Sequence, residues 1–332
     1  MVDTLLPFIL YCLAGGSSLL KEITIQLTEH CNLRCPYCFA PKNGSNEISD
    51  NDFERFKRFC LENKVDCIHI TGGEPALHSK FSKIVNELSF ISTLVIYSNL
   101  TLPNCIDDIR ENSDIFFLVN LNDKDFYSSQ QWEVLNSNIV KIKQKSLRVG
   151  VGHTFFKMPI IQDFNYCIDF ILSNAISHFR MSQAVMCQDT GVGLNKKEIE
   201  ELYDYVAENI VAWEKKGIKA YFDCPIPPCF INLKVFDFLR KHRAVSIVCS
   251  PKVFVTWDYK LTHCYSTMGL FMPPFEKFKN INDASNYVKN IIAGISVNRD
   301  ISLCNECKYE GIGLCGCPFY SISNKECAYE NK

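Results

Sequence analysis

Three cysteines, Cys31, Cys35 and Cys38, lie within eight residues of one another. Thiolates at such short spacing hold either an iron–sulfur cluster or zinc. A structural zinc site is usually closed by four protein ligands, and the adjacent His30 is poorly placed to be the fourth. A short loop can instead wrap three corners of an iron–sulfur cube and leave one iron without a protein ligand. The spacing therefore favours a cluster with one open iron.

A second motif, Thr71-Gly72-Gly73-Glu74-Pro75, directly follows an apolar segment. Its two glycines allow the backbone to approach a ligand closely. The Glu74 carboxylate can accept a charge-assisted hydrogen bond from an ammonium group. The motif alone would also fit a tight glycine turn with a solvated glutamate.

The elements that must position these motifs alternate along the first two-thirds of the chain. Six apolar segments predict buried parallel strands: 22–28, 66–70, 93–98, 115–121, 147–155 and 178–185. Helices are expected between them at 49–63, 80–88, 129–145, 161–174 and 196–216, with a weaker one at 103–112. Ser49 should begin the first helix and Gly217 should end the last. Repeated strand–helix units predict an α/β fold, a partial (β/α)6 parallel barrel.

We expect three parts: an N-terminal extension (1–21), the partial barrel (22–217) and a smaller C-terminal domain (218–332). Short strands are expected at 218–222, at 252–257 and around Leu261, with a helix at 284–293. The cysteine-rich end predicts that bound metal stabilises this last part.

The order of the two motifs, Cys-x3-Cys-x2-Cys after the first strand and Gly-Gly-Glu after the second, resembles the radical S-adenosylmethionine (SAM) enzymes. The resemblance implies a [4Fe–4S] cluster whose open iron is chelated by the amine and carboxylate of SAM. It assigns Gly72, Gly73 and Glu74 to SAM binding. It also implies reductive cleavage of SAM to a 5′-deoxyadenosyl radical, which removes a hydrogen atom from the substrate.

Further cofactor contacts are implied only by this resemblance. Tyr37 matches the aromatic position that lies against the adenine. Ser98 and Asn99 match ribose contacts at the end of the third strand, and Asn120 and Asn122 stand similarly after the fourth. Each could instead be an ordinary strand terminus.

The C-terminal cysteines resemble a SPASM domain, an extension that holds two auxiliary [4Fe–4S] clusters. The gaps between the first four cysteines of the final run are two, seven and one residues, where that family has two, five and three. Arg243 stands where the family has an upstream ligand, so Cys229 is the candidate replacement, Cys224 the second, and an open iron the third alternative. A zinc tetrathiolate is also considered. The candidate ligands are Cys229, Cys249, Cys264, Cys304, Cys307, Cys315, Cys317 and Cys327.

Composition limits the partners and the compartment. The net charge is −2, so no broad field would attract nucleic acid or an anionic membrane. The apolar segment 5–14 lacks a preceding Lys or Arg and is too short to span a bilayer. We therefore expect a cytoplasmic protein, in which most of the 18 cysteines stay reduced or bind metal.

The SPASM resemblance implies an oxidoreductase-like enzyme that modifies a ribosomal peptide by cross-linking or epimerisation. Only about 21 residues precede the first strand, so any leader peptide is expected to bind either a separate leader-binding protein or the enzyme itself. A flavodoxin or ferredoxin is expected as electron donor. Tyr265 stands where sulfatase-maturing relatives carry an aspartate, which argues against that activity. The alternatives are a dehydrogenase or rearrangement enzyme acting on a small molecule, and a non-enzymatic zinc or redox scaffold. No catalytic residue is assigned; the substrate-side candidates are His153, Arg180, Gln183 and Tyr265.

Overall fold

The computed structural model describes residues 20–38, 40, 44–184, 192–225, 230–246, 249–250, 252–264 and 272–297. In these ranges nine strands form one sheet in the order β7-β6-β5-β4-β3-β2-β1-β8-β9. All neighbours are parallel except β8 and β9. The strands are β1 (Glu22–Gln26), β2 (Cys67–Thr71), β3 (Thr93–Ser98), β4 (Ile115–Asn120), β5 (Arg148–Phe155), β6 (His178–Gln183), β7 (Lys219–Phe222), β8 (Val253–Val255) and β9 (Leu261–Thr262).

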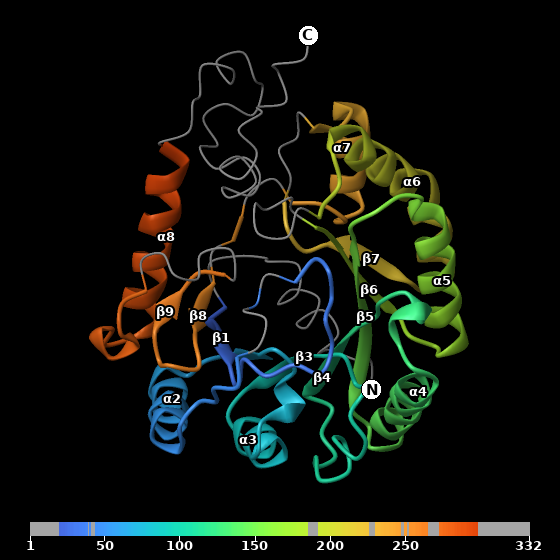
Figure 1. The fold of residues 1–332 in the computed structure, drawn as a ribbon. Helices are drawn as coiled ribbons and strands as arrows, with labels where there is room; N and C mark the ends of the chain where they lie inside the picture. Colours follow the sequence, from blue (N-terminus) through green and yellow to red (C-terminus); the bar gives the residue numbers. More distant parts are fainter. Residues whose placement is uncertain are drawn as a thin grey trace.

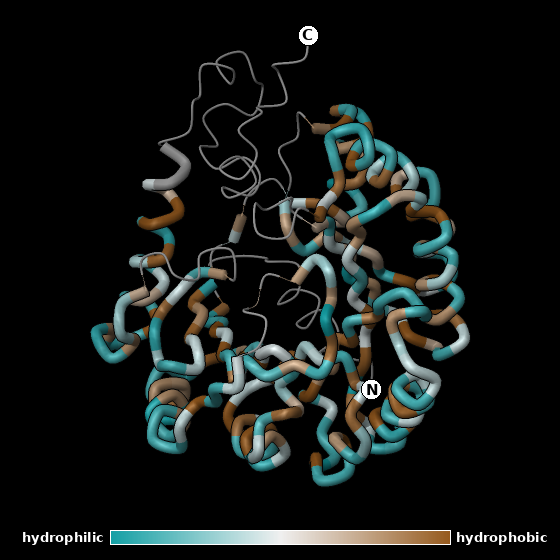
Figure 2. Tube along the Cα trace, in the orientation of Figure 1, coloured by the Kyte–Doolittle hydropathy of each residue, from teal (hydrophilic) through white to brown (hydrophobic). Residues whose placement is uncertain are grey.

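Helices cover the outer, convex side of this sheet (Figure 1). They are α2 (Asp50–Asn63), α3 (Phe81–Leu88), α4 (Ser129–Gln144), α5 (Ile160–Ser173), α6 (Lys196–Lys215), α7 (Leu233–Lys241) and α8 (Ile281–Val297), with short turns of 3-10 helix at η1 (Pro75–Leu77), η2 (Lys124–Phe126) and η5 (Phe275–Lys277). Figure 2 shows hydrophilic residues along their outward-facing turns. The main hydrophobic core lies between these helices and the sheet.

Local signals explain where the helices begin and end. The Ser49 hydroxyl accepts a hydrogen bond from the backbone N–H of Asp52 at 3.1 Å, which starts α2. Asn195 and Glu198 form a reciprocal capping box at the start of α6. Gly217 follows α6 with φ of 80°, a left-handed conformation that suits glycine.

A second, smaller hydrophobic cluster shows how strongly the sheet is curved. It joins Cys67 of β2, Val95 of β3 and Phe116 of β4 to Tyr221 of β7, at the edge of the sheet. These strands are not all neighbours, so their side chains meet across the concave side. The Arg180 guanidinium lies 5.3 Å from the Tyr97 ring centre, which connects β6 to β3 across the same interior.

The predicted α/β fold with a partial barrel is confirmed, and its six strands and five principal helices lie close to the expected ranges. The weak helix expected at 103–112 is wrong, because this segment consists of turns and irregular backbone. Asn104 there has φ of 61°, which a right-handed helix cannot contain. Helix α7 was not expected, although Asn232 caps it and Phe236 and Leu239 give it a buried side.

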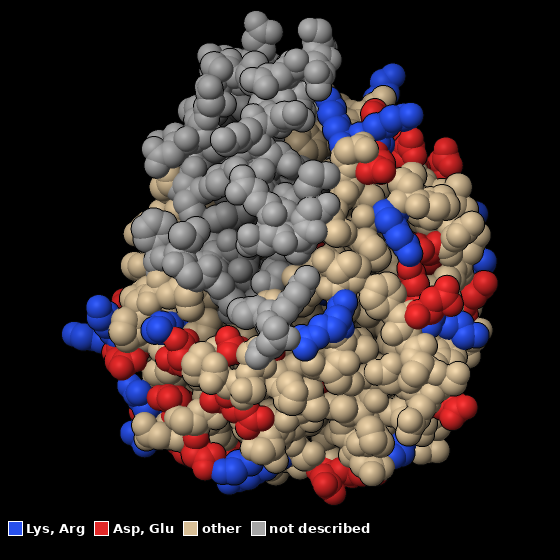
Figure 3. All heavy atoms as spheres, viewed as in Figure 1, with Lys and Arg blue, Asp and Glu red and all other residues tan. Residues whose placement is uncertain are grey.

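The sheet continues beyond residue 217, because β7 pairs with β6 and β8 pairs in parallel with β1. The expected boundary between two domains at 217 stays a prediction. On the face in Figure 3, acidic and basic side chains are interspersed over the described surface. A search of the described residues finds no helix of the length and hydropathy needed to cross a bilayer.

Candidate functional site

The three cysteines of the first motif lie in the loop that follows β1. Cys35 is buried, and Cys31 and Cys38 are partly buried. Burial, together with the neighbouring Glu74, Cys35 and Cys38, raises the pKa of Cys31 to about 11, against a hydrogen bond from the backbone N–H of Leu33. The thiols are therefore close enough to influence one another. Three crowded sulfur donors are a set that suits an iron–sulfur cluster, which keeps them as thiolates.

The Gly-Gly-Glu motif is attached to this loop through the backbone. The N–H of Gly73 donates to the carbonyl of Thr28, and the N–H of Glu74 donates to that of His30, each at 2.7 Å. A Cβ atom at Gly73 would lie 2.4 Å from the His30 carbonyl oxygen, and one at Gly72 would lie 2.9 Å from that of Thr28. Both glycines are thus needed for packing between the two motifs. Their contact with a cofactor stays a prediction.

Glu74 is almost completely buried, with 1% of its surface exposed. Its Oε1 accepts hydrogen bonds from the Ser98 hydroxyl at 2.8 Å and the Ala76 N–H at 3.1 Å, and its Oε2 accepts one from the Asn99 N–H at 2.7 Å. Burial raises its pKa to about 7, although these hydrogen bonds favour the charged form. The carboxylate is held in a fixed orientation and retains room for one further donor.

Asn99 also connects β3 to the cysteine loop. Its side-chain amide donates to Asn32 Oδ1 at 2.9 Å, and the amide of Asn32 donates to the Thr101 hydroxyl at 2.8 Å. Ser98 and Asn99 therefore make their described contacts with Glu74 and Asn32. Ribose contacts for them stay predictions.

Tyr37 is fixed by the segment that follows β4. Its hydroxyl donates to Asn122 Oδ1 and accepts from the Asn120 amide at 3.3 Å, while its ring lies 5.2 Å from the Phe156 ring. The amide of Asn122 also donates to Cys35 Sγ at 3.5 Å. Of the two asparagines, Asn122 thus has the closer relation to the cysteines, which a pattern of strand ends could not distinguish.

Two ion pairs line the concave side of the sheet. Glu22 pairs with Lys252 at 2.9 Å and lies 3.5 Å from His69. Arg180 pairs with Asp223, which also accepts a hydrogen bond from the Ser182 hydroxyl at 2.9 Å.

On the same inner face of β1 lies Gln26, which is 1% exposed and whose amide makes no hydrogen bond within the described residues. Sequence reasoning missed Gln26, Ser182 and Asp223. The alternation of side chains along β6, with Arg180 and Ser182 on one face, is the signal that could have found Ser182.

The same alternation decides between two readings of His153 and Gln183. Each could contact substrate at the mouth of the barrel or make a hydrogen bond in the core. The structure places the His153 ring next to the carboxylate of Asp163 on α5. The side-chain oxygen of Gln183 accepts a hydrogen bond from the Tyr203 hydroxyl of α6. Both therefore lie on the outer side of the sheet. Arg180 lies inside, and Tyr265 is outside the described residues.

Of the candidate auxiliary ligands, the structure describes only Cys249 and Cys264. They lie on either side of the β8–β9 hairpin, and both are partly buried. Cys249 Sγ lies 3.4 Å from His263 Nε2, a neighbour that sequence reasoning missed. Burial lowers the pKa of His263 to about 4, so the ring is neutral. The alternative Cys224 is exposed. The rest lie outside the described residues: Cys229, Cys304, Cys307, Cys315, Cys317 and Cys327.

Comparison with known proteins addresses the identity of the cysteine loop and the Gly-Gly-Glu motif. Residues 25–125, which contain both, match the family model of the radical SAM superfamily. By this match the chain is a radical SAM enzyme. The prediction of a radical SAM enzyme is thereby confirmed, and the family implies a [4Fe–4S] cluster and SAM as cofactors.

Sequence relatives of this radical SAM chain include GTP 3',8-cyclases. The one from Clostridium acetobutylicum is 33% identical over 97 residues, which are 27% of this chain and 30% of the relative. The one from a Sulfurovum species is 26% identical over 175 residues, which are 47% and 53% of the two chains. The chain thus spans between about a third and a half of these relatives.

Solved structures extend the likeness in fold to most of the chain. Streptococcus suis SuiB bound to S-adenosylmethionine superposes with a TM-score of 0.67 at 18% identity, over 93% of this chain and 75% of SuiB. The enzyme anSMEcpe with bound AdoMet and the Cp18Cys peptide gives 0.63 at 14% identity, over 93% and 92%. At such identities the likeness concerns the fold.

Proposed function

We propose that this radical SAM enzyme reductively cleaves SAM and abstracts a hydrogen atom from a peptide substrate. Cys31, Cys35 and Cys38 would hold the [4Fe–4S] cluster, which supplies the electron that converts SAM to methionine and a 5′-deoxyadenosyl radical. The supporting observation is that the two motifs form one hydrogen-bonded unit, with the buried Glu74 carboxylate beside the thiols. Glu74 can thus receive the amine of SAM next to the open iron.

The surrounding residues would orient SAM. Ser98 and Asn99 keep the Glu74 carboxylate fixed toward the amine through their hydrogen bonds. The Tyr37 ring would lie against the adenine, held in place by Asn120 and Asn122. A rotationally fixed ring and carboxylate lower the entropy lost when SAM binds.

Within the described part of the barrel interior, the two ion pairs favour a peptide over a nucleotide. The charges of Glu22, Lys252, Arg180 and Asp223 cancel in two pairs. A nucleoside triphosphate carries several negative charges and needs unpaired Arg or Lys groups for binding. Neutral amides of a peptide could instead bond to the Gln26 amide, which has no hydrogen-bond partner among the residues that the structure describes.

Auxiliary clusters are the second part of the proposal. Cys249 and Cys264 would provide ligands from the β8–β9 hairpin, and Cys304, Cys307, Cys315, Cys317 and Cys327 would provide the others. Cys229 is the proposed replacement for the missing upstream ligand. The β8–β9 hairpin supports this reading, because it presents two partly buried thiols beside the parallel sheet.

One alternative remains, a reaction on a small molecule, which the likeness to GTP 3',8-cyclases favours. The non-enzymatic scaffold is excluded by the family assignment. The expected surroundings are a cytoplasm with flavodoxin or ferredoxin as electron donor.

The test uses anaerobically reconstituted enzyme, dithionite, SAM and the short peptide encoded beside its gene. Mass spectrometry and chiral amino-acid analysis should find a change in the peptide that depends on SAM. GTP in place of the peptide should give no new product. A product from GTP together with an unchanged peptide would refute the peptide proposal and support the small-molecule alternative.

A further inference from the structure

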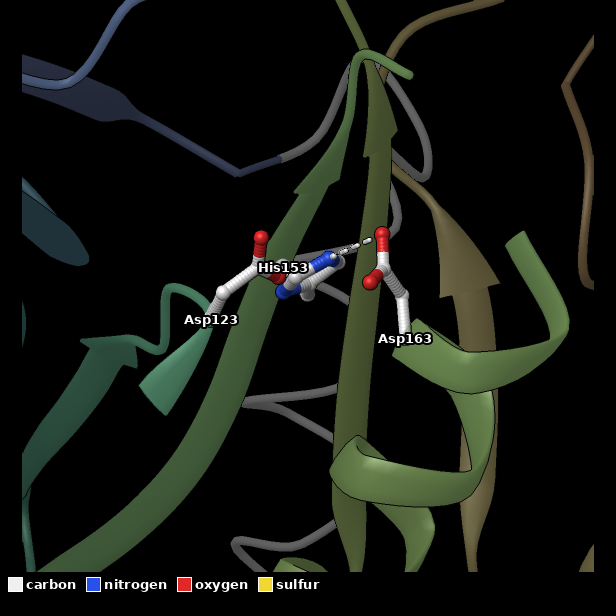
Figure 4. A group of neighbouring side chains, drawn as sticks. All are labelled: Asp123, His153 and Asp163. Carbon is white, nitrogen blue, oxygen red and sulfur yellow. Dashed lines mark ion pairs between the residues drawn. The ribbon is translucent and has the colours of Figure 1, made fainter. Parts of the chain in front are cut away.

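A buried polar group lies on the outer side of the barrel, away from the cysteines. It consists of Asp123, just before η2, His153 on β5 and Asp163 in the first turn of α5 (Figure 4). One potential ligand atom from each residue lies within 4.8 Å of the other two. His153 is 2% exposed and Asp163 is 7% exposed. Three chain segments thus bring an imidazole and two carboxylates together in a place with little access to water.

The orientation of His153 is fixed by its other nitrogen. Nδ1 lies 2.7 Å from the carbonyl oxygen of Leu121, which can only accept a hydrogen bond. Nδ1 therefore carries a proton, and Nε2 is the atom that faces Asp163. Histidine ligands of metals are commonly oriented in this way, by a hydrogen bond from the nitrogen that does not bind the metal.

The contact between His153 and Asp163 is too long for a hydrogen bond. Nε2 and Oδ2 are 3.7 Å apart, and neither makes a hydrogen bond within the described residues. A direct N–H···O bond would bring these atoms to about 2.7–3.2 Å. Two ligands of one tetrahedral Zn²⁺, with bonds of about 2.0–2.1 Å, lie roughly 3.3–3.5 Å apart. The observed separation is close to that of two ligands sharing a cation.

An available carboxylate oxygen and a fourth donor complete the group. Lys157 pairs with Oδ2 of Asp123 at 2.5 Å and leaves Oδ1 outside that ion pair. Although burial lowers the pKa of His153, the Cys167 thiol and Asp163 raise it to about 10, so without a metal the ring is charged, and a bound cation would replace its Nε2 proton. Cys167 is fully buried one turn beyond Asp163 on α5, and its thiol interacts electrostatically with the His153 ring. Zinc accepts this mixture of nitrogen, oxygen and sulfur ligands.

We propose that Asp123, His153 and Asp163 form a Zn²⁺ site separate from the iron–sulfur clusters, with Cys167 available as the fourth ligand. The site adjoins Asn122 along the chain. Asp123 belongs to it, and the Leu121 carbonyl is hydrogen-bonded to His153. A bound ion would fix the segment that contacts Tyr37 and Cys35.

The experiment uses full-length enzyme whose cysteine sites are first filled with iron and sulfide under anaerobic conditions. The protein is incubated with ZnCl2, freed of excess metal by gel filtration, and assayed for zinc, iron and sulfide. The wild type should retain about one zinc per chain. His153→Gln and Asp163→Asn should bind zinc at least tenfold more weakly, with unchanged iron. Asp169→Asn, on the exposed side of α5, is the matched control and should keep the zinc.

Two results would overturn the proposal. A wild type without zinc would mean that His153 and Asp163 share only a proton. Equal zinc in the wild type and in both variants would place the ion on cysteines. If the variants do not fold, zinc X-ray absorption of the wild type decides. Nitrogen and oxygen neighbours with at most one sulfur support the site, and a shell made mainly of sulfur refutes it.

Discussion

The Ser98 hydroxyl donates a hydrogen bond to the Glu74 carboxylate at 2.8 Å, from the end of β3 to the motif that follows β2. Together with the N–H of Asn99, it determines where the buried carboxylate points. The family resemblance assigns Ser98 to the ribose, whereas its described contact orients Glu74. The proposed SAM site therefore depends on support between neighbouring strands.

Glu74 should make SAM binding depend on pH. Its pKa is raised to about 7 by burial, so below pH 7 the carboxyl group must lose a proton before it can accept from the amine of SAM. Affinity should increase from pH 6 to pH 8, and at pH 6 it should be about tenfold weaker than at the plateau. Calorimetry on wild type and Glu74→Gln tests this. The ratio of the two affinities removes the titration of SAM itself, and a ratio independent of pH would contradict the assigned role.

Gly73→Ala should disrupt the cysteine loop. The new methyl group would lie 2.4 Å from the His30 carbonyl oxygen, and backbone cannot move aside as a flexible side chain can. We expect a loss of about 1–3 kcal/mol in the free energy of unfolding and less iron after reconstitution. Gly294→Ala on α8 is the control, because a methyl group there meets nothing within 4 Å. Full iron content in Gly73→Ala would refute this packing.

Asn122→Ala should lower the reduction potential of the cluster held by Cys31, Cys35 and Cys38. The variant lacks the donor to Cys35 Sγ, and hydrogen bonds to sulfur stabilise the reduced cluster. A redox titration followed by electron paramagnetic resonance measures the shift. The Tyr37 hydroxyl also interacts with the Cys35 thiol, so Tyr37→Phe should lower the potential as well. Asn136→Ala on α4 removes an amide that bonds to the Trp132 carbonyl, and its potential should stay at the wild-type value. An unchanged potential in Asn122→Ala would exclude the role.

Cys264→Ala should remove one auxiliary cluster and leave SAM cleavage intact. Three [4Fe–4S] clusters correspond to about twelve irons per chain, so this variant should contain about eight. Cys60→Ala is the control, because Cys60 is a fully buried thiol of α2 and should keep all the iron. Equal iron in Cys264→Ala and wild type would contradict the assignment of Cys264.

Much of the barrel was predictable because its signals are local. Apolar strand segments and the Ser49 cap lie in continuous sequence, and both chemical motifs directly follow strands. The segment around Asn104 was not predictable, because one left-handed residue within a helix-compatible composition redirects the chain.

The facing of polar side chains was harder to predict than the strands. His153 lies on the outer side of the sheet and Arg180 on its concave side, a difference that depends on strand register. Asp223 pairs with Arg180 only because β7 lies beside β6 in the sheet. No pattern within either strand indicates that pairing.

The most direct test of the account measures 5′-deoxyadenosine. Anaerobically reconstituted enzyme is incubated with dithionite and SAM, and the nucleoside is quantified by liquid chromatography. The account predicts turnover by the wild type and by Cys60→Ala, and none by Cys35→Ala, which should also lack one cluster. Absence of 5′-deoxyadenosine from the wild type, together with equal iron and sulfide in Cys35→Ala, would contradict the account.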